Sequence, residues 1–170
     1  IVAIKVLDSE NRGYLSDWAA GVEKVVELFD QGEIRVDAIN MSLVSDDTFT
    51  GVCDTFLSSL SAACAAAKVR GIAVFAASGN DGSTTQMPSP ACYSATVSVG
   101  SVLDTAPDQI SSFTSRNALT DLLAPGEYIT ATGRTGTTST FHGTSQACPH
   151  AVAAALILRQ VDPLLSPTRI

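Results

Sequence analysis

The chain has 170 residues, of which 45% are hydrophobic and only 16% are charged, a composition typical of one globular domain and not of a disordered segment. Its net charge of −7, with no Lys/Arg cluster to offset it, argues against nucleic acid as a partner. Apolar runs reach at most about ten residues, so we expect no membrane-spanning segment and no membrane partner.

Short β-branched runs alternate with longer helical stretches along the chain. Residues 1–7 predict a buried strand, residues 16–29 a helix capped by Ser16, and residues 36–43 a second strand. A helix over residues 54–70, ended by Gly71, precedes a third strand over residues 72–77. Residues 78–93 indicate a long loop, residues 96–99 a fourth strand, and residues 122–123 a short fifth strand. We expect a hairpin within residues 128–141, followed by a long apolar helix.

This order of elements predicts an α/β fold, in which helices cover both faces of a parallel sheet. Functional groups in such folds gather at the carboxyl ends of the strands. Residues 40–45 and 78–81 follow two of the predicted strands, so we expect them to line the functional cleft.

The most informative motif is FHGTSQACPH at residues 141–150, which leads directly into the apolar helix. It places Ser145 at the junction between a glycine-containing turn and the helix. The N–H groups at a helix N-terminus point toward whatever such a hydroxyl attacks. This is the arrangement that a nucleophilic serine needs beside a developing oxyanion.

No partner base for Ser145 is evident, because the chain has only two histidines. His150 follows Ser145 by five residues, about 140° around a helix, so it faces away. His142 lies on the extended approach to Ser145 and would line the cleft, but no partner orients its ring as a base.

A second motif, SGNDG at residues 78–82, follows the buried third strand. By itself it fits a plain turn after a strand. Together with Ser145 and the strand order, it favours a role for the Asn80 amide as a donor to an oxyanion, while Gly79 lets a substrate backbone approach.

These segments resemble, in the family's order, the C-terminal two-thirds of a subtilisin-like serine peptidase (subtilase) catalytic domain. The resemblance is carried by residues 36–43, 74–82, 90–100 and 122–126, and by GTS at residues 143–145 with PH at residues 149–150. It covers nearly the whole chain.

The resemblance implies a secreted, monomeric serine endopeptidase of broad specificity that requires no cofactor and cleaves polypeptides through an acyl-enzyme on Ser145. Asn80 and the backbone N–H of Ser145 would be the oxyanion donors. The residues implied in substrate binding lie on three segments: Ser42, Leu43, Val44, Ala77, Ser78, Gly79, Gly143 and Thr144.

Subtilases carry their catalytic groups in the chain order Asp, His, Ser. Neither an Asp-Ser/Thr-Gly turn nor a His-Gly-Thr-His helix occurs here. We therefore expect residues 1–170 to be a partial subtilase catalytic domain, truncated at both ends, that lacks the Asp and His and is inactive alone.

Two alternatives to a peptidase remain. One is a pseudoenzyme or scaffold module that only holds peptides. The other is an α/β-hydrolase, which is disfavoured because that class requires Gly-x-Ser-x-Gly and here the last position is Ala147.

Four positions, Val44, Ser45, Gln146 and Asp121, bear on the details of the resemblance. Val44 and Ser45 stand where the family has small glycine-rich residues at the mouth of the primary pocket, and Gln146 stands where it often has methionine. Asp121 matches a position that binds structural calcium in some relatives, with carbonyls near Ser94 and Thr96, although the sequence favours a solvated aspartate at the start of a strand.

Four cysteines allow three full pairings. Cys53 and Cys64 lie on one predicted helix about 16 Å apart, too far for a bridge. Cys64 and Cys148 fit as free, buried core residues, which leaves Cys53 and Cys92 as the better candidates for a disulfide.

Overall fold

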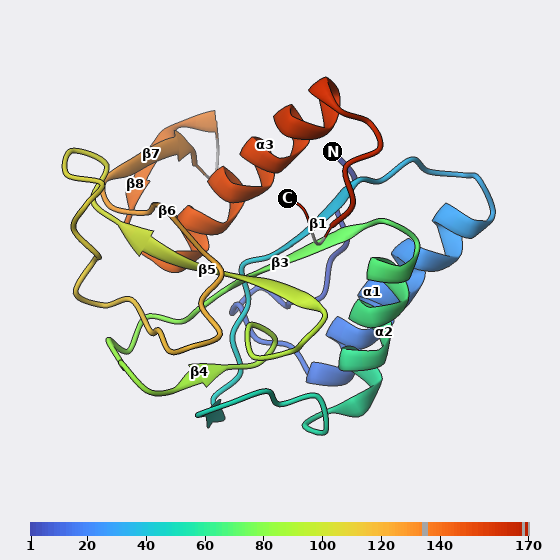
Figure 1. The fold of residues 1–170 in the computed structure, drawn as a ribbon, viewed down its shortest axis with the longest axis horizontal. Helices are drawn as coiled ribbons and strands as arrows, with labels where there is room; N and C mark the ends of the chain where they lie inside the picture. The colour runs from blue at the N-terminus through green and yellow to red at the C-terminus, as the bar shows by residue number, and fades with distance from the viewer. Residues whose placement is uncertain (134–135, 168, 170) are drawn as a thin grey trace.

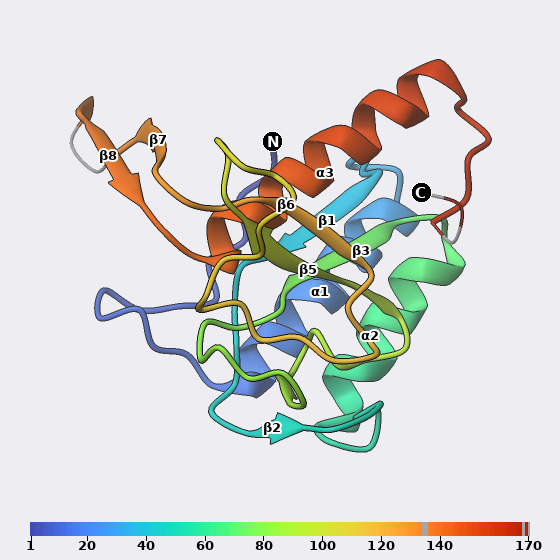
Figure 2. The same ribbon diagram turned by 60° about the vertical axis from the view of Figure 1, so that its left-hand side comes forward.

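The computed structural model describes residues 1–133, 136–167 and 169. Its main sheet has the strand order β1-β3-β5-β6, and all neighbouring strands are parallel. The strands are β1 (Ala38–Met41), β3 (Ala73–Ala77), β5 (Thr96–Val102) and β6 (Leu122–Pro125). Helices α1 (Leu15–Asp30) and α2 (Ser58–Val69) cover one face of the sheet, and α3 (Thr144–Val161) covers the other (Figures 1 and 2). The predicted α/β fold with helices on both faces is confirmed.

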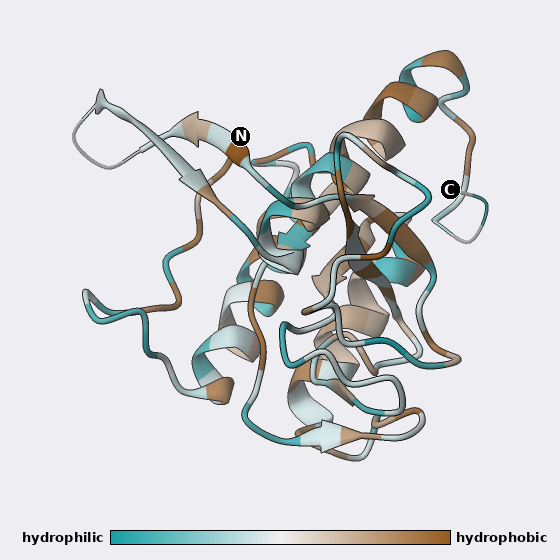
Figure 3. Cartoon of the chain, turned by 90° about the vertical axis from the view of Figure 1, so that its left-hand side faces the viewer, coloured by the Kyte–Doolittle hydropathy of each residue, from teal (hydrophilic) through white to brown (hydrophobic). Residues whose placement is uncertain are grey.

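Strand β3 is buried on both sides, and its alternating side chains supply both halves of the core. Val74 and Ala76 pack in the cluster shared with α1 and α2, whereas Phe75 and Ala77 pack in the cluster shared with α3. The sequence of a strand that is covered on both faces is a continuous apolar run, without the alternation of apolar and polar residues that a half-exposed strand shows. Figure 3 shows this apolar interior, and it also shows apolar residues near the end of α3, where Ile157 is 63% exposed.

Two small antiparallel pairs complete the fold. β7 (Ile129–Thr132) pairs with β8 (Thr138–Phe141), which confirms the predicted hairpin, although residues 134–135 of its turn lie outside the described residues. β2 (Thr48–Phe49) pairs with β4 (Met87–Pro88). Strand β4 falls in the stretch predicted as a loop, and β2 lies between two predicted elements, because two-residue strands leave no periodic pattern.

The predicted strand at residues 1–7 is wrong. The structure assigns no strand there, and Ile1, Val2 and Ile4 are exposed. Val6 instead packs near Gly21 of α1. An apolar β-branched run becomes a strand only where a neighbouring backbone pairs with it, and no described strand does so here.

Both predicted helix starts need correction. Helix α1 begins at Leu15, and the N–H groups of Asp17 and Trp18 donate to the carbonyl of Tyr14, so Ser16 lies inside the first turn and is not the cap. Helix α2 begins at Ser58, after Leu57 in the left-handed region (φ 47°). Cys53 is therefore not on the same helix as Cys64.

The disulfide joins Cys53 and Cys92, whose Cα atoms are 5.4 Å apart. The backbone N–H of Cys53 also donates to the carbonyl of Cys92 at 3.0 Å. Cys64 and Cys148 are free and buried. All three sequence expectations on the cysteines are confirmed.

We expect removal of this disulfide to destabilise the chain by about 4 kcal/mol, because the bond closes a loop of 39 residues and so restricts the unfolded chain. The measurement is urea unfolding of a Cys53→Ala/Cys92→Ala variant, with Cys64→Ala as the matched control that leaves the bridge intact. Reductant should destabilise the parent and the control but leave the double variant unchanged. An equal response of all three chains would contradict the prediction.

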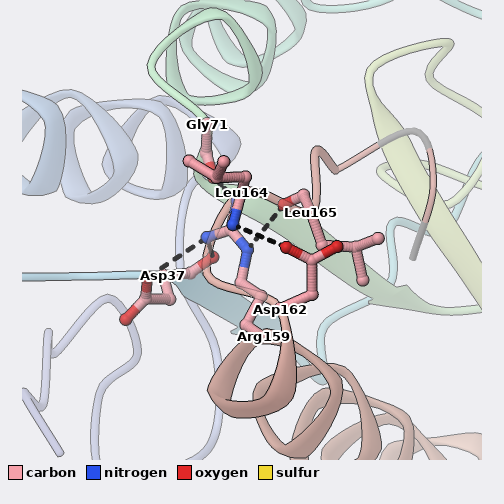
Figure 4. Close-up of polar contacts among 6 residues, drawn as sticks. All are labelled: Asp37, Gly71, Arg159, Asp162, Leu164 and Leu165. Atoms are coloured by element: carbon pink, nitrogen blue, oxygen red, sulfur yellow. Dashed lines mark hydrogen bonds and ion pairs between the residues drawn. The ribbon is translucent and has the colours of Figure 1, made fainter.

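The C-terminal end of α3 is fastened to the start of the sheet by Arg159 (Figure 4). Its Nη1 donates to the backbone carbonyl of Asp37 at 3.0 Å and pairs with the Asp37 carboxylate at 3.2 Å. Its Nη2 donates to the carbonyl of Gly71, just before β3, and its Nε to the carbonyl of Leu165. The side chain is only 13% exposed, so these contacts fix α3 against the residue that precedes β1.

Within the part of the chain that the structure describes, no helix combines the length and the hydropathy needed to cross a bilayer.

Candidate active site

The carboxyl ends of β1 and β3 lie at one edge of the sheet, and α3 begins there. The two strands are parallel neighbours, with Met41 opposite Ala76, so the residues that follow them emerge side by side. Ser42 follows β1 and contacts Ser145, while Asn80 follows β3 and contacts Thr144. The structure thus brings the two predicted motifs and the predicted cleft residues together.

Gly143 forms the turn that leads into α3. Its φ of 154° lies in the region that side chains rarely adopt. A Cβ atom there would lie 2.8 Å from Gln146 Oε1 and 3.4 Å from Asn80 Nδ2. Glycine is needed at this position for the backbone angle.

Thr144 is fully buried and holds the Asn80 side chain in one orientation. Its backbone N–H and its Oγ1 both donate to Asn80 Oδ1 at 2.9 Å, and its Oγ1 accepts from the N–H of Gly79 at 3.2 Å. A backbone N–H can only donate, so the atom that faces it must be the amide oxygen. The Nδ2 group of Asn80 is therefore directed away from Thr144 and is a donor.

Ser145 is half-buried in the first turn of α3. Its Oγ lies 3.5 Å from the carbonyl oxygen of Ser42, and the Ser42 hydroxyl donates to the carbonyl of Ser145 at 2.8 Å. The N–H groups of a first turn have no acceptor within the helix. The Thr144 N–H donates to Asn80 Oδ1, and the N–H groups of Gln146 and Ala147 donate to the carbonyl of Gly143. In the described structure the first-turn donor without an acceptor is therefore the N–H of Ser145. The Ser145 hydroxyl thus lies beside one unpaired backbone N–H and an oriented amide, an arrangement suited to acyl transfer.

The remaining predicted substrate-binding residues differ in accessibility. Leu43 is half-buried and Val44 is 43% exposed at the end of β1. Ala77 and Ser78 are fully buried, so in this structure their side chains lie in the interior of the protein, behind the predicted cleft, and do not line its surface. Gly79 is also buried, with φ 102°, and a Cβ there would lie 2.9 Å from the ring of Pro88.

Both histidines are held by neighbours other than Ser145. His142 Nδ1 accepts from the N–H of Tyr128 at 3.2 Å, and the two rings meet edge to face. His150 Nδ1 lies 2.8 Å from the carbonyl of Gln146. Among the described residues, the structure shows no hydrogen bond from either ring to Ser145, so no general base is assigned.

The residues around Asp121 do not fit a calcium site. Asp121 Oδ2 accepts from the N–H of Ser98 at 2.8 Å, and the carbonyl of Ser94 accepts from the Lys68 ammonium at 3.0 Å. An ammonium on that carbonyl competes with a cation and repels it. No group of three His, Cys, Asp or Glu side chains in the described part of the chain is placed to hold a metal. We therefore derive no step that uses calcium.

Cys148 follows Ser145 by three residues but is a core residue. Burial raises the pKa of its thiol, and that of Cys64, to about 12. The thiolate is the reactive form of cysteine, so neither thiol is a nucleophile at neutral pH.

Sequence reasoning missed the contacts that Asn40 and Ser42 make. Asn40 Nδ2 donates to Ser42 Oγ at 3.1 Å, and Ser42 in turn donates to Ser145. The sequence signal that could have indicated these contacts is the pair of polar side chains, two residues apart, at the end of an otherwise apolar strand.

The parallel sheet, with a serine at the start of a helix and an amide beyond the neighbouring strand, defines an α/β protein with a serine-centred site. A sequence profile of the subtilase family matches residues 1–170. The chain belongs to this family of subtilisin-like serine proteases.

Individual relatives agree with this assignment. The subtilisin of Bacillus pumilus is 38% identical over 169 residues, which span 96% of this chain and 54% of the relative. An extracellular serine proteinase of Thermus sp. (strain Rt41A) is 32% identical over 169 residues, spanning 98% of this chain and 38% of the relative. The crystal structure of a cold-adapted subtilisin-like serine proteinase superposes with a TM-score of 0.77 at 28% identity, over 97% of this chain and 55% of that one. The chain thus spans about half the length of these relatives, or less.

Proposed function

We propose that this chain is the nucleophile-bearing part of a serine endopeptidase. The observation that carries the proposal is the pair of bonds from Thr144 to Asn80 Oδ1, which leaves Asn80 Nδ2 as a donor beside the start of α3. In the proposed reaction Ser145 Oγ attacks the carbonyl carbon of a peptide bond. The oxyanion that forms accepts from Asn80 Nδ2 and from the N–H of Ser145.

Collapse of the tetrahedral intermediate breaks the C–N bond, releases the amine and leaves an ester on Ser145, which water then hydrolyses. A base must take the proton of Ser145 Oγ during the attack and give it to the departing amine, and it must then take a proton from the attacking water and return it to Ser145. The 170 residues do not supply this base, because their two histidines are engaged elsewhere. We therefore propose that the chain alone does not turn over peptides, and that an aspartate and a histidine of the family type complete the site.

The substrates we propose are polypeptides that pair with the backbone at residues 42–44. Val44 is exposed there, and we propose that its side chain narrows the primary pocket and so restricts which substrate side chains are accepted. We further propose that the protein is secreted and acts as a monomer. Secretion is supported by the extracellular relative and by a disulfide, a bond typical of oxidising compartments.

Labelling with a serine-reactive phosphonate tests this function. The protein to use is a chimera in which residues 1–170 replace the matching part of the Bacillus pumilus subtilisin, so that the remaining part of that protein would supply the Asp and His that subtilases carry before the serine. Label on Ser145 that disappears in Ser145→Ala supports the peptidase. A folded chimera that binds peptides but takes no label would favour the peptide-binding scaffold.

We expect the active chimera to tolerate dilute peroxide better than relatives that carry methionine directly after the nucleophile. Gln146 follows the nucleophile where the family often has methionine, and oxidation of such a sulfur is the main route by which peroxide inactivates a site of this kind. Residual activity after timed exposure is the measurement, and Gln146→Met is the matched control that should restore sensitivity. Equally rapid inactivation of both chimeras would refute the expectation.

A further inference from the structure

The carbonyl group of Ser145 lacks the helical hydrogen bond that its position calls for. In an α-helix each carbonyl accepts from the N–H four residues later. The residue four positions after Ser145 is Pro149, which lies within α3. Proline has no N–H, and its ring also presses on the carbonyl four residues before it.

The hydroxyl of Ser42 donates to this carbonyl at 2.8 Å. Ser42 lies one residue beyond the end of β1, so the bond joins the sheet edge to the first turn of α3 across 103 positions of sequence. Since a carbonyl can only accept, the single proton of the Ser42 hydroxyl must point at Ser145.

Asn40 fixes that direction. Its Nδ2 donates to Ser42 Oγ at 3.1 Å, which fills an acceptor position of the hydroxyl and leaves its proton free for Ser145. Asn40, Ser42 and Pro149 thus act on one carbonyl, that of the proposed nucleophile.

We propose that Ser42 and Asn40 are positioning residues that replace the hydrogen bond removed by Pro149, and that they thereby fix Ser145 relative to the carboxyl end of β1. The functional part of this inference rests on the proposed role of Ser145 as a nucleophile. Near the other end of α3, Arg159 binds Asp37, the residue directly before β1. Residues that flank β1 on both sides therefore hold the two ends of α3.

A double-mutant cycle between Ser42→Ala and Pro149→Ala tests the contact in the 170-residue chain by urea unfolding. With Pro149 present, loss of the hydroxyl leaves the carbonyl without its donor, and we expect the folding equilibrium constant to fall about tenfold. In the Pro149→Ala background the helix supplies an N–H to that carbonyl, so the same loss of the hydroxyl should cost about twofold or less.

Ser98→Ala is the matched control. Its hydroxyl also donates to a backbone carbonyl, that of Leu119 at 2.6 Å, but it makes no contact with Pro149 in the described structure. Its cost should be the same whether or not the chain also carries Pro149→Ala. An equal cost of Ser42→Ala in both backgrounds would overturn the proposal.

Asn40→Asp serves as a second variant if Ser42→Ala does not fold in either background. Asn40 is exposed, and a carboxylate at this position accepts the Ser42 proton and so removes it from Ser145 without loss of volume. We expect a loss of stability that Pro149→Ala suppresses. A loss of the same size in both backgrounds, or no loss at all, would overturn the proposal.

The chimera reports the effect on the nucleophile. Ser42→Ala should slow phosphonate labelling of Ser145 about tenfold, and Ser42→Thr, which keeps the hydroxyl, should restore the rate. Coupling in the unfolding cycle without any labelling of the parent chimera would refute the proposed function alone. Labelling that is unaffected by Ser42→Ala would refute the positioning role alone.

Discussion

The chimera that joins residues 1–170 to the upstream part of the Bacillus pumilus subtilisin should hydrolyse peptides, whereas the 170 residues alone should show no turnover that depends on Ser145. The reason is that neither histidine of this chain contacts Ser145, while the family places its base and its orienting carboxylate upstream. Loss of the base alone lowers kcat on the order of 10⁶-fold, a magnitude taken from measurements on a subtilisin, a member of the same family.

The measurement is the initial rate of hydrolysis of a chromogenic peptide, compared between the chain, the chimera and its Ser145→Ala variant. We expect the variant to fall to the level of the chain alone, because Ser145 and the base act as one unit. His142→Ala and His150→Ala in the chimera are matched controls and should retain most of the activity. Turnover by the 170 residues at ordinary enzyme rates, abolished by Ser145→Ala, would refute the assignment of the base to an upstream segment.

The second large effect is expected at Asn80. Asn80→Leu in the chimera should lower kcat by about 10²–10³-fold with little change in KM, because the amide donor would act only on the charge that develops in the transition state. This magnitude also comes from the equivalent change in a subtilisin. The measurement is steady-state kinetics on a peptide substrate.

A Thr144→Val variant distinguishes donation by the Asn80 amide to the oxyanion from an effect on the position of residues 79–80. Asn80→Leu also removes the acceptor of two hydrogen bonds from Thr144, so part of its effect could arise from movement of residues 79–80. Thr144→Val removes one of these bonds and keeps the amide, so its loss of kcat should be much smaller. An equal loss in the two variants would show that placement, and not oxyanion stabilisation, is the contribution of Asn80.

The parts of the fold that could be predicted are those governed by local patterns. The apolar run of β3 and the order of strands and helices predicted the parallel sheet, and that order also predicted that Ser42 and Asn80 would meet at one edge. The glycine turn before Ser145 marked the start of α3 within one residue. Residues 1–7 were mispredicted because strand formation depends on a neighbouring backbone, which a local pattern does not reveal.

The sequence by itself determined the α/β order, because short-range periodicity and turn residues encode it, and it determined the family through the resemblance of its motifs to those of subtilases. It left open the disulfide pairing and the direction of the Asn80 amide. Only the tertiary structure decided that Cys53 meets Cys92, that Thr144 turns the amide oxygen of Asn80 inward, and that Ser42 supplies the donor that Pro149 lacks. These contacts join residues between 39 and 103 positions apart. The packing of α3 against the sheet sets the contacts of Thr144 and Ser145, and packing in the cluster shared with α1 and α2 sets the disulfide, so no local pattern encodes them.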